Sequence, residues 1–346
     1  MHPVKKILVL VIVFITFFII YNLLKTRQTI KTNYEIERKK LSEGFTEKEP
    51  KGISIKSIPD KYLSLPIREF IVKSSYNSAL NDKNKVEKKQ IRNVLERGCR
   101  LIDFEIYTRD NNEYVSYSDD PEFKSMSTEN EVAERVSLAS AFTTVVGYAF
   151  TDPAPSPNDP LFISLRIKNN STEAYSRIAS LIDYSFKNRL YSGRVNGETK
   201  LEDLMGKVVF IMDKTSSPDY KNYVKCVSEP CFKLTDYINM DAGTISFSKY
   251  SYTNLETLPQ VPVMPGGKKT DIKTFMMVTP TRFDMVRQPD PVDTIAKWHP
   301  QFLLYNFSVA SEELDAYENI FNKNEASFVP ISVMIASRGE NDKGNE

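Results

Sequence analysis

The sequence has few of the residues that most enzymes use to move protons or to build a disulfide framework. Its 346 residues include only two histidines, His2 and His299, and three cysteines. Because histidine is the side chain that ordinarily titrates near neutral pH, histidine-based acid–base catalysis has few candidates here. Three cysteines are too few for a disulfide-rich fold, although Cys226 and Cys231 are close enough in sequence to pair across a short loop.

A large excess of one charge is also missing. There are 46 basic and 45 acidic side chains, so no overall field attracts the protein to nucleic acid, and we expect no nucleic-acid partner. Apolar residues are plentiful, at 41% of the chain with 20 Phe and 18 Tyr. This composition is sufficient for one large core.

The longest apolar run follows a short tail, residues 1–6, and covers residues 7–24. It contains no charged side chain and is just long enough for a helix to cross a bilayer. A cleaved signal peptide is the alternative, but the run is long for one and no small-residue cleavage site follows it. We therefore expect a single-pass membrane anchor.

Charges beside the anchor give only a weak indication of its orientation. Two lysines precede the run, whereas Lys25, Arg27 and Lys31 follow it. The slight excess after the run favours a cytosolic body. Glycosylation sequons are also present at two places: overlapping sequons begin at Asn169 and Asn170, and another begins at Asn306 in a run expected to be a buried strand.

Residues 25–57 are rich in Lys, Glu and Thr and predict a polar stalk. Beyond them, apolar runs alternate with helical stretches, which fits a parallel barrel of eight βα units or a doubly wound sheet. The expected strands are 69–75, 101–107, 114–117, 161–167, 207–212, 244–247, 275–278 and 302–307. The expected helices are 85–97, 129–150, 172–186 and 201–204.

Two segments resemble the opening of the phosphoinositide-specific phospholipase C barrel. Residues 71–80, IVKSSYNSAL, are similar to the family's ISSSHNTYL, and residues 98–107, GCRLIDFEIY, are similar to its GCRCVELDCW. Further likenesses follow in the family's order: PLFISL at 160–165, LMGKVVFI at 204–211, TRFD at 281–284, WHPQFLLYNF at 298–307 and FNKNEASFVP at 321–330.

The resemblance covers roughly residues 60–332 and favours the barrel over the doubly wound sheet. It implies an α/β fold, a single (β/α)8 TIM-like barrel of the phospholipase C type, preceded by the membrane helix. The implied divisions are an X-like half at 58–215, a divergent connection at 216–243, a Y-like half at 244–335 and a disordered tail at 336–346.

The family's two catalytic histidines are replaced in this chain. The first aligns with Tyr76, and the second, in the family's YHG strand end, aligns with Ser118. Neither replacement titrates near neutral pH, so neither can transfer a proton as the family's histidines do. The resemblance therefore implies no catalytic residue in this chain.

The calcium ligands implied by the family are only partly kept. Asn77, Asp103 and Glu105 align with oxygen ligands, but Arg166 stands where the family has a glutamate. A guanidinium is not a metal ligand and its charge repels a cation. We expect Arg166 to pair with Asp103 or Glu105, leaving a vestigial site without calcium or another cofactor.

The positions that hold the substrate in the family are also changed. Two lysines align with Ile211 and Asp213, while an arginine and a tyrosine align with Phe275 and Met277. Since phosphate groups require cationic donors, these exchanges imply a loss of phosphoinositide recognition.

Two functional hypotheses remain. The first is a membrane-anchored pseudoenzyme with a structural or interaction role, whose candidate partners are a protein or a lipid headgroup. The second is an active phosphodiesterase with a relocated acid–base pair on Asp103, Glu105 and Asp119. Converging cations at the strand ends would indicate a phosphate site, and the sequence offers Arg166, Arg109 and Lys73 as candidates.

Overall fold

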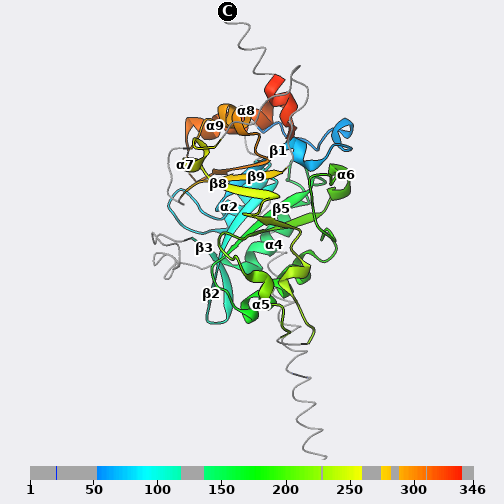
Figure 1. The fold of residues 1–346 in the computed structure, drawn as a ribbon, viewed down its shortest axis with the longest axis vertical. Coiled ribbons are helices and arrows are strands. Elements are labelled where there is room, and N and C mark those ends of the chain that lie inside the picture. Colours follow the sequence, from blue (N-terminus) through cyan, green and yellow to red (C-terminus); the bar gives the residue numbers. More distant parts are fainter. Residues whose placement is uncertain are drawn as a thin grey trace, which may run out of the picture. The chain divides into compact units, whose positions relative to one another are not determined.

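Eight short parallel strands form the centre of the unit that spans residues 49–346 (Figure 1). The computed structural model describes residues 53–117, 136–226, 229–258, 274–281, 288–308 and 310–336, together with Tyr21. The strands run in the order β7-β6-β5-β2-β1-β10-β9-β8. Their bounds are Phe70–Tyr76 (β1), Leu101–Arg109 (β2), Leu161–Ile167 (β5), Val208–Asp213 (β6), Met240–Ala242 (β7), Phe247–Ser251 (β8), Phe275–Thr279 (β9) and Phe302–Asn306 (β10).

The barrel is nearly closed. Among the residues that the structure describes, no strand ladder joins β7 to β8, which are connected by residues 243–246 without a helix. Gly243 begins this turn with φ +85°, and a Cβ there would lie 2.8 Å from the Thr215 side chain. The expected eight-stranded parallel barrel is therefore confirmed, with one open seam.

Three further strands lie outside the parallel set. Asn112–Ser116 (β3) pairs antiparallel with β2, Val136–Ser137 (β4) pairs with β3, and Phe328–Pro330 (β11) pairs antiparallel with β1. The strand expected at 114–117 is thus a hairpin partner of β2 and not a barrel strand. The barrel strand that takes its place is β7, which lies in the segment expected to be a connection. The sequence does not predict β7, because three residues are too few to show strand periodicity.

Helices surround the strands. Figure 1 shows α8 and α9 on one side of the sheet and α4 and α5 on the other. Several begin at side-chain caps that the sequence supplies: Ser137, Ser171, Asp290 and Ser311 each accept a hydrogen bond from a backbone N–H in the first turn. The helices are Lys88–Glu96 (α2), Leu138–Ala149 (α4), Thr172–Phe186 (α5), Leu201–Leu204 (α6), Tyr252–Leu255 (α7), Pro291–Trp298 (α8) and Glu312–Lys323 (α9).

The barrel interior is apolar over most of its depth. Every residue of β1, β5 and β6 is buried, as expected for parallel strands that are covered on both faces. Three positions implied as altered substrate contacts, Ile211, Phe275 and Met277, belong to this core. In this fold their side chains pack against other apolar residues and are not exposed for ligand contact.

Several features noted in the sequence fall outside this account. In the part of the chain that the structure describes, no helix has the length and apolar character needed to cross a membrane. The anchor expected at 7–24 lies outside the described residues, except for Tyr21. Most of the expected stalk, residues 337–346 of the expected tail and residues 129–135 of an expected helix also lie outside them. Cys226 and Cys231 are joined by a disulfide, whereas Cys99 is free and buried.

Candidate functional site

Polar side chains gather at the carboxyl ends of the barrel strands, which is where sites are built in such folds. Tyr76 and Asn77 end β1, Asp103 and Glu105 lie on β2, and Arg166 lies on β5. The β2–β5 register places Glu105 directly opposite Arg166. The structure therefore brings these five sequence-predicted residues together, while Ser118 and Asp119 lie outside the described residues.

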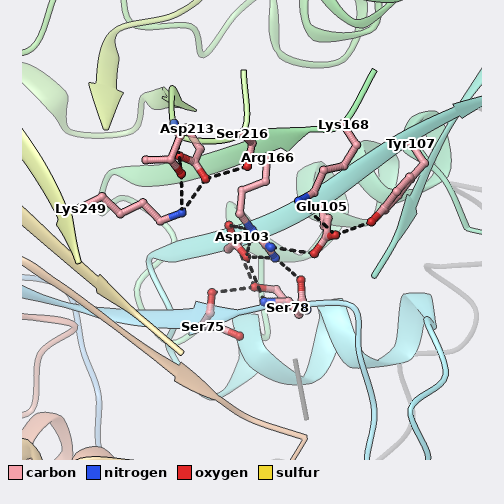
Figure 2. Close-up of polar contacts among 12 residues, drawn as sticks. Ser75, Ser78, Asp103, Glu105, Tyr107, Arg166, Lys168, Asp213, Ser216 and Lys249 are labelled. Carbon is pink, nitrogen blue, oxygen red and sulfur yellow. Dashed lines mark hydrogen bonds and ion pairs between the residues drawn. The ribbon is translucent and has the colours of Figure 1, made fainter. Parts of the chain in front are cut away.

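Arg166 is at the centre of this group and contacts all three expected calcium ligands. Figure 2 shows it between Asp103 and Glu105. Its Nη2 donates to Asp103 Oδ2 over 2.8 Å, and its Nε lies 3.1 Å from both Asp103 oxygens. Its Nη1 donates to Glu105 Oε2 over 2.7 Å, and Nη2 also donates to Asn77 Oδ1. The expected ion pair is confirmed, and it involves both carboxylates.

The two carboxylates also have partners other than Arg166. Asp103 Oδ2 accepts from the backbone N–H of Asn77 over 3.1 Å, which the left-handed backbone of Asn77, φ 41°, makes possible. Glu105 Oε1 accepts from the Tyr107 hydroxyl over 2.5 Å and lies 3.6 Å from Lys168 Nζ. Asp103, Glu105 and Tyr107 alternate along β2 and so share its inner face.

Burial makes these contacts strong and mutually dependent. Asp103 is fully buried, Glu105 is 2% exposed and Arg166 is 5% exposed. Burial alone would lower the pKa of Arg166, but Asp103, followed by Tyr76 and Glu105, holds that pKa well above its ordinary value. The guanidinium therefore stays charged at every pH at which the protein is folded.

This arrangement does not fit a calcium ion. Calcium needs six to eight oxygen ligands around a free centre. Here the oxygens that face one another bond to the Arg166 guanidinium, which carries the positive charge that the ion would supply. We therefore assign no chemical step to a metal at this position.

Tyr76 lies against the same cation. The Arg166 Cζ is 4.5 Å from the centroid of the Tyr76 ring, which is a cation–π distance. Burial raises the pKa of the Tyr76 hydroxyl, and Arg166 only partly opposes the rise. The phenol is therefore neutral at physiological pH and cannot serve as a general base there.

The other side of the mouth is formed by β6, β8 and β9. Lys249 Nζ on β8 lies 2.6 Å from Asp213 Oδ2 on β6, as Figure 2 shows. Asp213 also accepts from the Thr215 hydroxyl over 2.6 Å and from the Ser216 hydroxyl over 3.1 Å. Burial alone would raise the pKa of Asp213, but Lys249 and these donors hold it below its ordinary value.

A cavity of about 510 Å³ opens between the two sides. Three cationic side chains line it, Arg166, Lys168 and Lys249, and none of its lining residues is acidic. The three carboxylates that pair with these cations lie behind them. The other lining residues are mostly hydroxyl-bearing: Tyr76, Thr215, Ser216, Tyr250, Ser251, Thr279 and Thr281, with Pro280.

Sequence reasoning identified only one of these three cations. Lys73 points away from the mouth, where its Nζ lies 3.0 Å from Glu318 on α9, and Arg109 is beside Asp110 at the hairpin end. Their expected place at the mouth is therefore wrong. Lys168 follows Arg166 by two residues and lies one position beyond the end of β5, so strand alternation could have found it. Lys249 is distant in sequence, and only the barrel fold brings it near.

Comparison with known proteins agrees with this geometry. Residues 63–214 match the family described as phosphatidylinositol-specific phospholipase C, X domain. A search of curated proteins returns no significant match.

Two solved structures have the same fold. PLC21 of L. pealei aligns with a TM-score of 0.55 and 14% identity, over 78% of this chain and 37% of its own length. PLC21 of S. officinalis aligns with a TM-score of 0.53 and 13% identity over the same shares. The chain thus matches little more than a third of these two proteins. Residues 63–214 are thus similar to the phosphatidylinositol-specific phospholipase C X domain, and the fold is a barrel of the phospholipase C type.

Proposed function

We propose that this protein is a membrane-anchored, phospholipase C-like pseudoenzyme whose barrel mouth binds a phosphate ester without cleaving it. The observation that carries the proposal is the position of Arg166. Its guanidinium bonds to Asn77, Asp103 and Glu105 together. The anchor is the apolar run at 7–24.

The groups available for proton transfer support the same proposal. Tyr76 is buried and has a raised pKa, so it remains protonated near neutral pH. Asp103 and Glu105, the carboxylates of the relocated-pair hypothesis, are both bonded to Arg166. A general base must reach its substrate with a free lone pair and a suitable pKa, and these contacts oppose that role.

Binding is supported by the lining of the cavity. Lys168 and Lys249 are ammonium groups at its wall, with several hydroxyl donors between them. Ammonium and hydroxyl donors are the usual partners of phosphate oxygens. Burial lowers the pKa of Lys168 while Glu105 opposes the change. A bound phosphate would stabilise the charged form of this lysine further.

Hydrolysis is the first test. The full chain in mixed micelles that contain phosphatidylinositol or its phosphorylated forms should release no water-soluble phosphoinositol, with or without calcium. The family's two proton-transfer groups are each worth roughly a hundredfold to ten-thousandfold in rate. Turnover by the wild-type chain that disappears in Asp103→Ala would defeat the pseudoenzyme proposal and favour the relocated pair.

Binding is tested separately with inositol 1-phosphate and inorganic phosphate in calorimetric titrations. Asp213→Asn should bind more tightly than wild type, because Lys249 is released from its ion pair. Adding Lys249→Met to that variant should weaken binding about tenfold to a hundredfold, the usual worth of a hydrogen bond from a charged donor. Lys200→Met, on the exposed Lys200–Glu202 pair, is the control and should bind as wild type. No measurable binding by Asp213→Asn would contradict the binding role.

A further inference from the structure

Two features outside the barrel mouth point to the same cellular compartment. One is the disulfide between Cys226 and Cys231, and the other is the exposed sequon at Asn169 and Asn170. We propose that the body of the protein lies on the luminal or extracellular side of the membrane and that this asparagine pair carries an N-linked glycan. This orientation is the opposite of the one favoured by the charges beside the anchor.

The disulfide lies at the surface. Cys226 is exposed and Cys231 is partly exposed, and their Cα atoms are 5.2 Å apart. Surface disulfides persist in oxidising compartments and are reduced by the thiol systems of the cytosol. The remaining cysteine, Cys99, is fully buried behind the barrel. The chain therefore carries no exposed free thiol, as is usual for secreted and luminal domains.

The structure distinguishes the two sequons clearly. Asn306 is 1% exposed at the end of β10, and its Oδ1 accepts from the backbone N–H and the hydroxyl of Ser308. A glycan there would require the barrel core to open. Asn169 and Asn170 are exposed in the loop between β5 and α5, the kind of surface loop in which glycans are accommodated.

Among the described residues, the hydrogen bonds of Asn169 and Asn170 do not involve the carboxamide nitrogens to which a glycan would be attached. Asn169 Oδ1 accepts from the backbone N–H of Thr108 over 2.8 Å, and Asn170 Oδ1 accepts from the Tyr175 hydroxyl. These contacts use the carboxamide oxygens, whereas the sugar attaches to the nitrogen. The loop directly follows Lys168, which lines the cavity, whereas neither asparagine is among the lining residues.

The charges beside the anchor favour the opposite orientation. Two basic residues precede the run, whereas six follow it within sixteen residues: Lys25, Arg27, Lys31, Arg38, Lys39 and Lys40. Positive charge alone would therefore place the body in the cytosol, and the disulfide and the exposed sequon are the observations that argue against it. A body that folds with a surface disulfide supplies an independent indication of compartment.

The test uses the full chain, tagged at its C-terminus and translated with sealed eukaryotic microsomes. We expect a protein that moves faster on a gel after endoglycosidase treatment and a tag that resists protease until detergent is added. Asn169→Gln and Asn170→Gln locate the glycan, and the double variant should lose the shift entirely. Ser308→Ala removes the buried sequon and is the matched control, so its shift should equal that of wild type.

Each contrary result overturns part of the proposal. A membrane-inserted chain without a glycan, whose tag is digested in sealed microsomes, would place the body in the cytosol and refute the orientation. A protected tag on an unglycosylated chain would refute the glycan. If Ser308→Ala lost the shift while the Asn169/Asn170 double variant kept it, the assignment to the exposed loop would be wrong.

Discussion

The two sides of the barrel mouth use their charges differently. On the side of β1, β2 and β5, Arg166 is surrounded by Asp103, Glu105 and Asn77, and little space remains at the centre. On the side of β6, β8 and β9, Lys249 makes one ion pair and otherwise faces the cavity with hydroxyl groups. The first side is a closed electrostatic cluster, whereas the second keeps donors at an open surface.

This difference indicates which side of the mouth is free to bind a ligand. A buried cation among carboxylates satisfies their charge but offers nothing to a ligand. A lysine ammonium has three donors, so at a cavity wall it can donate to a phosphate while it stays paired with its carboxylate. The predictions below separate these two roles.

The largest effect should come from removing Arg166. Arg166→Met leaves Asp103 and Glu105 buried without their cation, and breaking such a buried pair costs about 3–5 kcal/mol of stability. Denaturant unfolding measures this directly. Lys200→Met breaks the exposed pair with Glu202 and should cost less than about 1 kcal/mol. Similar losses in both variants would mean that the Arg166 cluster contributes no more than a surface pair.

A second prediction concerns calcium binding at the Arg166 cluster. Calcium should leave the melting temperature of the wild-type protein unchanged, since binding to the native state alone would raise it. Arg166→Glu replaces the cation with a further oxygen ligand, so its stability should fall without calcium and recover when calcium is added. A micromolar calcium site in the wild-type protein, abolished by Asp103→Asn, would refute this account.

A third prediction compares two buried carboxylates with opposite pH behaviour. Burial, partly opposed by Arg100, raises the pKa of Asp159 to about 6, whereas Lys249 holds the pKa of Asp213 below its ordinary value. An unfolded aspartate titrates near about 3.9. The Asp159 contribution to stability is thus complete below that pH and is lost as pH rises through about 6.

For Asp213 the sign is reversed. Its contribution is present above the unfolded pKa and is lost as pH falls through its lower folded value. Free energies of unfolding measured from pH 3 to 7 should therefore lose the decline between about pH 4 and 6 in Asp159→Asn, and lose part of the acid sensitivity in Asp213→Asn. Interchanged behaviour of the two variants would contradict the assignments.

The smallest expected effect is that of restoring the histidines. The double variant Tyr76→His, Ser118→His should show no hydrolysis above wild type, because Arg166 still occupies the oxygen cluster and Phe275 remains in the core. Release of phosphoinositol from radiolabelled substrate gives the readout. Turnover in this variant alone would show that proton transfer was the sole missing function.

Much of the barrel could be predicted from the sequence. The long, largely buried strands β1, β2 and β5 and the capped helix α5 have clear patterns, and β5 and α5 have the expected bounds. The three-residue β7 could not be predicted, because so short a strand has no periodicity of its own. β7 is defined by its parallel pairing with β6, and this pairing exists only in the folded protein.

The candidate site likewise has residues that the sequence could predict and contacts that it could not. By itself the sequence determined that Tyr76, Asn77, Asp103, Glu105 and Arg166 belong together, because motifs along neighbouring strands fix their positions. Only the tertiary structure decided that Lys73 pairs with Glu318 on α9 and that Lys249 pairs with Asp213. It also decided that Asn306 is buried while Asn169 is exposed. Sequence fixes which residue stands at a strand end, but the direction and partner of a side chain depend on strands that are distant in the chain and adjacent in the barrel.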